Sequence, residues 1–372
     1  MMPAATRGAL SSEIQRWSGV GPYYAMFPVD FAFEVISEYS SDGDAVLDPF
    51  AGRASSIYAA AALGRSSYGV EINPVGWIYG QVKLQPATKW AVLKRLSDVQ
   101  RLADNLDQTY VQSQPEFFSV CYSSHVFRFL LSARDMLQWR TRRVDATLMA
   151  LLLVYLHGKY GQALSNQMRQ GKAMSPDYSI RWWRERQLQA PDIDPVAFMS
   201  QRINWRYQHG RPRLHGGKVT LGDSTVVLRR LAAQVRSGKR TKFDLLFTSP
   251  PYCGITNYHY DQWLRLWLLG GPPQPRTIPG NWTKRFDSKQ SYRKLLQTVF
   301  AQSADILAPG ATVYVRTDAR QFTYETTVDV LQEIFPNRNL QITPRPYSRT
   351  TQTALYGDKT KKPGEVDIVL TA

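Results

Sequence analysis

The sequence predicts an α/β fold in which a largely parallel sheet is interrupted by a mostly helical insertion. A short apolar run at residues 45–47 and a second expected strand at 67–71, which ends in an acid, are separated by an alanine-rich helical stretch at 55–63. A strand, a helix and a strand in this order indicate a parallel sheet with crossover helices. Long helical patterns replace this alternation from about residue 81, and the alternation resumes near residue 218.

Further elements are expected on both sides of the interruption. A helix over residues 29–40 precedes the first strand, because its apolar side chains share one helical face. Helical patterns within the insertion lie near 89–109, 122–139 and 144–164. After it, we expect strands at 218–221, 243–247, 311–316 and 366–370, and helices near 224–236, 258–269, 291–307 and 324–334. We therefore assign residues 1–80 and 215–372 to the sheet domain and residues 81–214 to the insertion.

Lysine and arginine outnumber aspartate and glutamate by 46 to 30, which gives a formal net charge of +16. A positive excess of this size favours a polyanionic partner, and nucleic acid before a membrane surface. A basic protein without such a partner is the alternative that charge alone leaves open. Hydrophobic residues make up 43% of the chain, which is enough for a sizeable core.

Cysteine and histidine usage argues against disulfide and metal frameworks. Cys121 and Cys253 are too few for a disulfide framework or a four-cysteine zinc site. The five histidines lack the spacing of metal ligands, so we expect no metal. Residues 1–10 lack an apolar signal core, and no apolar run reaches the roughly 18 residues that a membrane helix needs. A reducing cytoplasm fits these features best.

A loop with an acidic first residue follows the first strand, and a second acid ends the next strand. Residues 48–52 read Asp-Pro-Phe-Ala-Gly, in which Gly52 lets the backbone turn tightly and approach a ligand. Glu71 stands where a carboxylate can accept hydrogen bonds from both ribose hydroxyls of a nucleoside. Together these residues predict a nucleoside-cofactor pocket at the carboxyl ends of the strands. An ordinary turn at Asp48 and a surface acid at Glu71 are the alternative.

The most informative stretch is residues 244–252, DLLFTSPPY, in which a buried strand runs into a rigid loop that ends in an aromatic residue. Pro250 and Pro251 fix φ and remove two backbone donors, which leaves carbonyl acceptors. Enzymes that modify a base extrude it from the stack, and Tyr252 offers such a base a platform. The Ser249 hydroxyl and the Pro250 carbonyl can accept hydrogen bonds from its amino group. Acceptors placed off the ring plane stabilise the positive charge that develops on this nitrogen during methyl transfer.

These residues resemble the motifs of the amino-methylating DNA methyltransferases. The match is closest to the site-specific cytosine-N4 branch, in which Ser-Pro-Pro-Tyr is typical, whereas Asp-Pro-Pro-Tyr is commoner in the adenine-N6 branch. It covers about residues 1–85 and 215–372 and leaves the insertion unmatched. The segments that carry it are DPFAG at 48–52, EINP at 71–74, TSPPY at 248–252, YYAMFP at 23–28 and LGD at 221–223.

The resemblance implies a class I S-adenosylmethionine-dependent methyltransferase, with a Rossmann-like mixed seven-stranded sheet whose last strand is antiparallel. Residues 1–80 and 215–372 would then form the catalytic domain. The implied target-base residues, which we take as catalytic, are Ser249, Pro250, Pro251 and Tyr252. The implied ligands of the cofactor S-adenosylmethionine are Tyr24, Phe27, Asp48, Pro49, Phe50, Gly52, Glu71 and Asp223.

The sequence departs from the family pattern at several points. Ala54 replaces the second glycine of a common Gly-x-Gly, which narrows the approach to the methionine part of the cofactor. Met26 stands where a lysine is frequent, and Arg53 is the residue that could replace that lysine in a contact to the cofactor carboxylate. The insertion precedes the 221–223 segment, so the motif-order classes fit only roughly. Cys253 lies in the wrong order for a cytosine-C5 nucleophile, and we interpret it as a packing residue.

The second half of the insertion is basic and aromatic. Residues 169–218 contain ten lysines or arginines and four acidic residues, interleaved with Trp182, Trp183, Trp205 and Tyr207. This mixture suits phosphate contacts and base stacking, so we interpret the insertion as a target-recognition region. A helical cap with core tryptophans is the alternative. The candidate DNA contacts are Arg169, Arg181, Arg184, Arg186, Arg211 and Arg213.

The leading hypothesis is methyl transfer from S-adenosylmethionine to N4 of cytosine in a specific double-stranded DNA sequence, after base flipping. DNA adenine-N6 methylation, an RNA amino-methyltransferase and a non-catalytic DNA-binding relative are the alternatives, because one serine in place of aspartate does not set the base. The resemblance also implies a restriction–modification or defence setting, with a cognate endonuclease as partner. Such a protein would be cytoplasmic and associated with the nucleoid through DNA.

Overall fold

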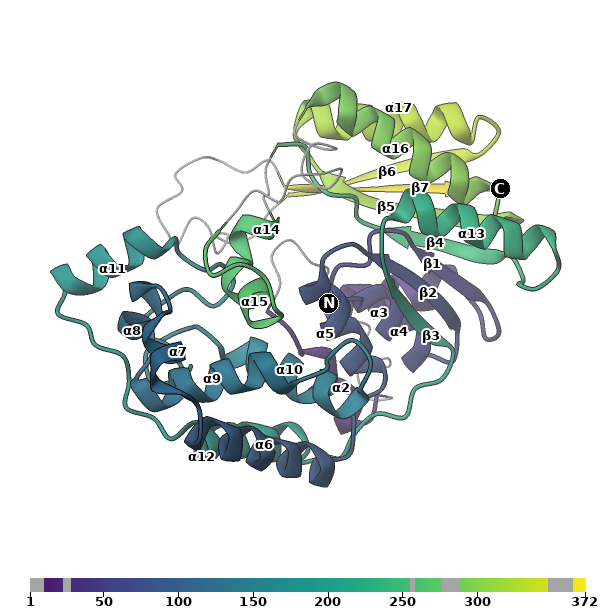
Figure 1. The fold of residues 1–372 in the computed structure, drawn as a ribbon. Helices are drawn as coiled ribbons and strands as arrows, with labels where there is room; N and C mark the ends of the chain where they lie inside the picture. Colours follow the sequence, from purple (N-terminus) through teal and green to yellow (C-terminus); the bar gives the residue numbers. More distant parts are fainter. Residues whose placement is uncertain (1–9, 23–27, 255–257, 276–287, 347–363) are drawn as a thin grey trace.

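A seven-stranded sheet organises the protein, with the strand order β3-β2-β1-β4-β5-β7-β6 (Figure 1). The computed structural model describes residues 10–22, 28–254, 258–275, 288–346 and 364–372. Strands β1 to β5 pair in parallel, and β7 is antiparallel to both β5 and β6. This order confirms the expected class I methyltransferase fold. The strands are β1 (Ala45–Asp48), β2 (Ser66–Glu71), β3 (Gly217–Leu221), β4 (Phe243–Thr248), β5 (Leu307–Asp318), β6 (Asn339–Arg345) and β7 (Glu365–Thr371).

Helices cover both faces of the sheet, because neighbouring strand residues point to opposite sides. Val46 packs with helices α3, α4 and α5, whereas Leu47 packs with α13, α16 and α17 (Figure 1). A short N-terminal helix, α2 (Ser12–Ser18), lies beside the first group. The bounds of these covering helices are α3 (Val29–Tyr39), α4 (Ser55–Ala62), α5 (Pro74–Leu84), α13 (Ser224–Arg236), α16 (Lys289–Ala304) and α17 (Gln321–Ile334).

The chain between α5 and β3 is described throughout and contributes helices but no strand to the sheet. Its buried residues, such as Leu130 and Met149, belong to the same hydrophobic cluster as Val46 of the sheet. The helices of this region therefore extend the core of one sheet face. They are α6 (Lys89–Asp104), α7 (Gln108–Gln112), α8 (Glu116–Cys121), α9 (Ser124–Met136), α10 (Arg143–Tyr155), α11 (Pro176–Glu185) and α12 (Pro195–Arg206).

Three elements differ from the sequence-based expectation. The helix expected over 144–164 ends at Tyr155, and the chain beyond it forms turns and an isolated bridge from Gly158 to Gln167. The helix expected over 258–269 is divided into α14 (Tyr258–Asp261) and α15 (Trp263–Leu268). Strand β6 was not expected, because it is a mostly exposed edge strand without an apolar run. Among the described residues, no helix has the length and apolarity needed to cross a membrane.

Candidate functional site

The candidate site lies at one edge of the sheet, where four parallel strands end. Asp48 ends β1, Glu71 ends β2, Thr248 ends β4, and Asp223 follows β3 by two residues. The chain order reverses between the neighbours β1 and β4, and such a switch point is where open α/β sheets bind ligands. The topology therefore brings the cofactor-side loop, residues 48–52, beside the base-side loop, residues 249–252.

The carboxylate of Asp48 joins these two loops. Its Oδ1 accepts hydrogen bonds from the backbone N–H of Phe50 (3.0 Å) and from the Thr248 hydroxyl (2.6 Å). Its Oδ2 accepts a hydrogen bond from the Ser56 hydroxyl of α4. Burial raises the pKa of Asp48 to about 6, although these three hydrogen bonds oppose the rise. The carboxylate thus ties the cofactor-side loop to α4 and to the last residue of β4, directly before the base-side loop. Its expected contact to the cofactor stays a prediction.

The carboxyl group of Glu71 is buried, with backbone donors beside it and no basic side chain paired with it in the described part of the chain. The backbone N–H of Asn73 donates a hydrogen bond of 2.7 Å to Oε1. Burial raises the pKa of Glu71 to about 8, and the N–H groups of Asn73 and Gly52 oppose this rise. A buried carboxyl without a cation partner is suited to hydroxyl donors from a ligand.

Backbone hydrogen bonds connect the loops after β1, β2 and β3. The N–H of Ala51 bonds to the carbonyl of Val70, and the N–H of Gly222 bonds to the carbonyl of Glu71, both at 2.9 Å. The Ser224 hydroxyl donates to the carbonyl of Pro49. Asp223, expected at the cofactor adenine, caps α13 by accepting hydrogen bonds from the backbone and hydroxyl of Thr225. Phe50 is partly buried and packs against the hydrophobic cluster between the sheet and helices α13, α16 and α17.

The turn into α4 confirms that the backbone is tight here. Gly52 has φ 54° and Ala54 has φ 60°, so the alanine in the place of the second family glycine adopts a left-handed conformation. Arg53 is buried, and its guanidinium donates hydrogen bonds to the Gly21 carbonyl (3.0 Å) and the Ser55 hydroxyl (3.3 Å). Arg53 therefore anchors the chain that leads into residues 23–27. Tyr24, Phe27 and Met26 themselves lie outside the described residues.

The base-side loop presents its expected groups at the same edge. Ser249, Pro251 and Tyr252 are partly exposed, and Pro250 is buried. The Tyr252 hydroxyl donates a hydrogen bond of 3.2 Å to Glu365, the first residue of β7. Glu365 was not among the expected site residues, because no local sequence pattern marks it. Cys253 packs against the core on the α13 face, which agrees with its interpretation as a packing residue.

The segment that follows the base-side loop is attached to the insertion. Arg265 of α15 is fully buried and donates hydrogen bonds to the carbonyls of Leu153 (2.9 Å) and Gln170, which both belong to the insertion. The backbone and side chain of Asp261 bond to Ala173 and Lys172, respectively. These contacts attach the chain that leaves the base-side loop to the insertion.

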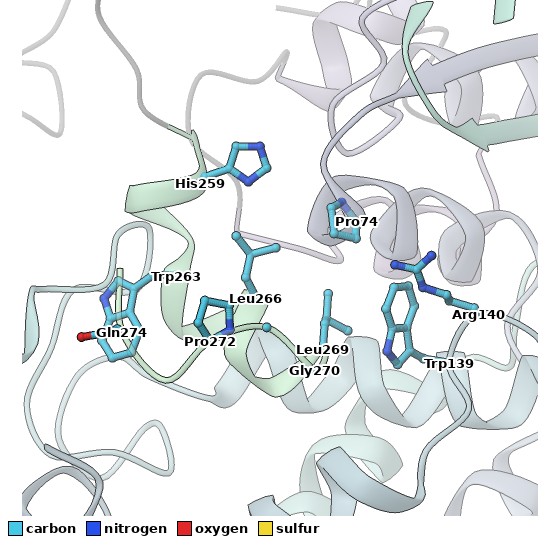
Figure 2. Close-up of a pocket in the computed structure, with 11 residues that line it drawn as sticks. Pro74, Trp139, Arg140, His259, Trp263, Leu266, Leu269, Gly270, Pro272 and Gln274 are labelled. Atoms are coloured by element: carbon cyan, nitrogen blue, oxygen red, sulfur yellow. The ribbon is translucent and has the colours of Figure 1, made fainter. Parts of the chain in front are cut away.

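A cavity of about 250 Å³ lies where this segment faces the start of α5. Figure 2 shows His259, Trp263 and Leu266 on one side and Pro74, Trp139 and Arg140 on the other. Most of the lining is apolar, and the Arg140 guanidinium lies 4.7 Å from the centroid of the Trp139 ring. Sequence reasoning missed these residues, because they come from three separate segments without a shared motif.

The candidate DNA-contacting arginines are not all equally available. Arg169, Arg181, Arg186 and Arg213 are exposed, whereas Arg211 is half-buried and donates to the Pro86 carbonyl at 2.7 Å. Arg184 is exposed and pairs with Glu116 on α8. Arg186 lies beside Glu185 (3.2 Å) and over the ring of Trp182 (4.6 Å). The exposed arginines on and near α11 remain the predicted basic surface.

The aromatic residues of the same region divide between two roles. Trp183 and Tyr207 are buried, and they donate hydrogen bonds of 2.7 Å to the carbonyls of Gln167 and Ala87. For these two residues the core interpretation is correct. Trp205 is exposed and Trp182 is half-buried, so only these two remain available to a partner.

Comparison with known proteins supports the family expected from the motifs. Residues 5–75 match the model of the N6/N4 DNA methylase family. A stretch of 49 residues is 45% identical to the Type II methyltransferase M.MthZI of Methanothermobacter thermautotrophicus, and it covers 13% of this chain and 14% of that protein. These matches confirm the resemblance to amino-methylating DNA methyltransferases, without separating N6 from N4, and they support S-adenosylmethionine as the cofactor.

Two solved structures align with most of this chain at low sequence identity. The rRNA methyltransferase aviRa from Streptomyces viridochromogenes aligns with a TM-score of 0.33 and 13% identity, over 97% of this chain and 92% of that one. TrmN from Thermus thermophilus aligns with a TM-score of 0.31 and 10% identity, over 97% and 52% of the two chains. Both scores are low, so the fold assignment rests on the strand order of the sheet.

Proposed function

We propose that this protein, as an amino-methylating DNA methyltransferase, transfers a methyl group from S-adenosylmethionine to N4 of cytosine in double-stranded DNA. The observation that carries the proposal is the Asp48 carboxylate, which bonds both to the cofactor-side loop and to Thr248. Through this contact the two loops share one edge of the sheet. A methyl donor and an acceptor amine bound by these loops would lie close together, which is the main requirement for the reaction.

The described residues fit the cofactor. Glu71 would accept hydrogen bonds from the ribose hydroxyls, since its carboxyl is buried at the end of β2 and not neutralised by a described cation. Gly52 has a left-handed conformation, which would let the backbone of this loop approach the bound cofactor closely. Asp223, two residues after β3 and at the start of α13, would contact the adenine. When bound, the cofactor supplies the electrophilic methyl group on its sulfonium.

The base-side loop would hold the extruded cytosine. Tyr252 would stack against the ring, while the Ser249 hydroxyl and the Pro250 carbonyl would accept hydrogen bonds from the N4 amino group. These acceptors favour a pyramidal nitrogen and stabilise its developing positive charge. Ser249 in place of aspartate supports cytosine as the target base. Pro251 contributes by restricting the loop backbone.

The helical insertion, residues 81–214, would recognise the target DNA, and residues 1–80 and 215–372 would form the catalytic domain. The exposed arginines of α11 and the net charge of +16 support DNA binding through phosphate contacts. The hydrogen bonds between Asp261 and the loop at 172–173 would link recognition to the base-side loop. The name of the matched relative, a Type II methyltransferase, supports a restriction–modification setting.

Product identification tests the proposal directly. The purified protein is incubated with S-adenosylmethionine and unmethylated duplex DNA of mixed sequence, and the digested nucleosides are separated by mass spectrometry. We expect N4-methylcytosine. N6-methyladenine would retain the mechanism and refute the choice of base, whereas methylation of RNA alone would refute DNA as the substrate.

A variant separates catalysis from cofactor binding. Tyr252→Ala should lose methyl transfer and keep the wild-type cofactor affinity, because in this proposal the ring would contact the base and not the cofactor. Calorimetry with S-adenosylhomocysteine measures this affinity in both proteins. A wild-type protein that binds neither S-adenosylmethionine nor S-adenosylhomocysteine would favour the non-catalytic alternative.

A further inference from the structure

We propose that Glu365 is a positioning residue for Tyr252 and that it fixes the orientation of the ring on which the target base stacks. The Tyr252 hydroxyl donates a hydrogen bond of 3.2 Å to Oε1 of Glu365. The two residues come from the loop after β4 and the start of β7, which lie at the same end of the sheet on either side of β5. This inference rests on the proposed function, because it assigns Glu365 a part in presenting the base.

The loop that carries Tyr252 explains why the ring needs an external contact. Pro250 and Pro251 restrict the backbone before the tyrosine, but they leave its two side-chain torsions unrestricted. The Tyr252 side chain is partly exposed, so packing does not enclose it fully. A hydrogen bond at the far end of the ring restricts both torsions at once.

Glu365 is itself held by charged neighbours on the adjacent strand. The antiparallel register places Arg316 of β5 opposite Asp367 of β7, two residues from Glu365. Arg316 donates hydrogen bonds of 2.6 and 2.8 Å to the two carboxylate oxygens of Asp367. The same guanidinium lies 3.5 Å from Oε2 of Glu365, the oxygen that does not accept from Tyr252.

The arginine at the centre of this network has little freedom. Its guanidinium carbon lies 3.4 Å from the centroid of the Phe31 ring, and the residue is buried. Arg345 of β6 donates a further hydrogen bond of 2.8 Å to Asp367. A buried arginine that donates two hydrogen bonds to one carboxylate is held more rigidly than an arginine in an exposed ion pair. Glu365 is therefore presented to Tyr252 from a fixed framework.

Loss of this contact is expected to affect the methyl-transfer step more than cofactor binding. A ring that rotates about its torsions holds the base away from the methyl donor for part of the time, and small errors of position lower the rate strongly. Glu365 does not belong to the strands that carry the cofactor-side loop, β1 and β2. The affinity for the cofactor should therefore stay at the wild-type value.

A double-mutant cycle tests the pairing. Tyr252→Phe and Glu365→Ala should each lower kcat about tenfold, and the double variant should lie within about twofold of either single variant. Glu365→Gln keeps an acceptor oxygen for the tyrosine and should retain kcat within about twofold of wild type. Additive losses, or a wild-type kcat in Glu365→Ala, would overturn the inference. If Glu365→Ala does not fold, a wild-type kcat in Tyr252→Phe overturns it equally.

A structural measurement keeps this inference separate from the proposed function. Crystal structures of wild type and Glu365→Ala show whether the Tyr252 ring changes orientation, and this result does not depend on any substrate. An unchanged ring refutes the positioning role even if the protein is an active methyltransferase. Glu333→Ala on α17 is the matched control, because it removes the same kind of side chain from a pair with Arg293 and Gln297 outside this network. It should leave both the ring and kcat unchanged.

Discussion

The buried carboxyl of Glu71 predicts that cofactor affinity rises with pH. Burial raises the pKa of Glu71 to about 8, so most molecules of the free protein carry a neutral carboxyl at pH 7. The ionised form can accept hydrogen bonds from both ribose hydroxyls, whereas the neutral form uses one oxygen for its own proton. With a pKa of about 8, the ionised fraction is about 0.09 at pH 7 and about 0.9 at pH 9. The affinity should therefore rise about tenfold, or about 1.4 kcal/mol, between these pH values.

Isothermal titration calorimetry with S-adenosylhomocysteine measures both the affinity and the protons released. At pH 7 the binding enthalpy should depend on the ionisation enthalpy of the buffer, with nearly one proton released from Glu71 per ligand bound. Glu71→Gln is the matched control, since it keeps the size of the side chain but does not titrate. Any pH dependence that remains in this variant belongs to the amino group of the ligand. An affinity that changes equally in wild type and Glu71→Gln would refute the reasoning.

Three further predictions concern stability and DNA binding. Burial raises the pKa of Asp48 from 3.8 to about 6, so its stabilising contribution is present below pH 4 and is lost as pH rises through 6. Asp48→Asn does not titrate, so its free energy of unfolding minus that of wild type should increase by up to about 3 kcal/mol between pH 4 and pH 8. Urea titrations measure this difference, and a difference that does not change with pH would contradict the prediction. Ala54→Gly should leave the midpoint of thermal unfolding unchanged or raise it, because a left-handed conformation costs alanine about 1–2 kcal/mol. The control Ala59→Gly in the interior of α4 should destabilise the protein by about 1 kcal/mol. Equal losses of stability in the two variants would show that the backbone of Ala54 is not strained. Arg181→Ala should weaken DNA binding and reduce the slope of log affinity against log salt by about 1 in fluorescence anisotropy, while Arg293→Ala on α16 should change neither.

The cofactor-side and base-side loops were predictable from the sequence because each is a local pattern. Residues 48–52 and 249–252 each follow an apolar run, and a strand that ends in a rigid loop needs no distant information to be recognised. The order of strands and helices was predictable for the same reason, since hydrophobic periodicity reports which face of each element is buried. Strand β6 escaped prediction because an exposed edge strand does not need an apolar pattern.

The tertiary structure decided what the acidic side chains do. Asp48 bonds to Thr248, 200 residues away, and Tyr252 bonds to Glu365, 113 residues away. Neither pair leaves a mark in the local sequence, because an acidic residue at the end of a strand looks the same whether it faces a ligand or a hydroxyl from a neighbouring strand. It also decided that Trp183 lies in the core, since a tryptophan beside basic residues suits either role. The sequence alone determined which chemical groups reach the edge of the sheet, and the packing of distant strands determined which of them face one another there, because hydrogen-bond partners are set by strand order and register.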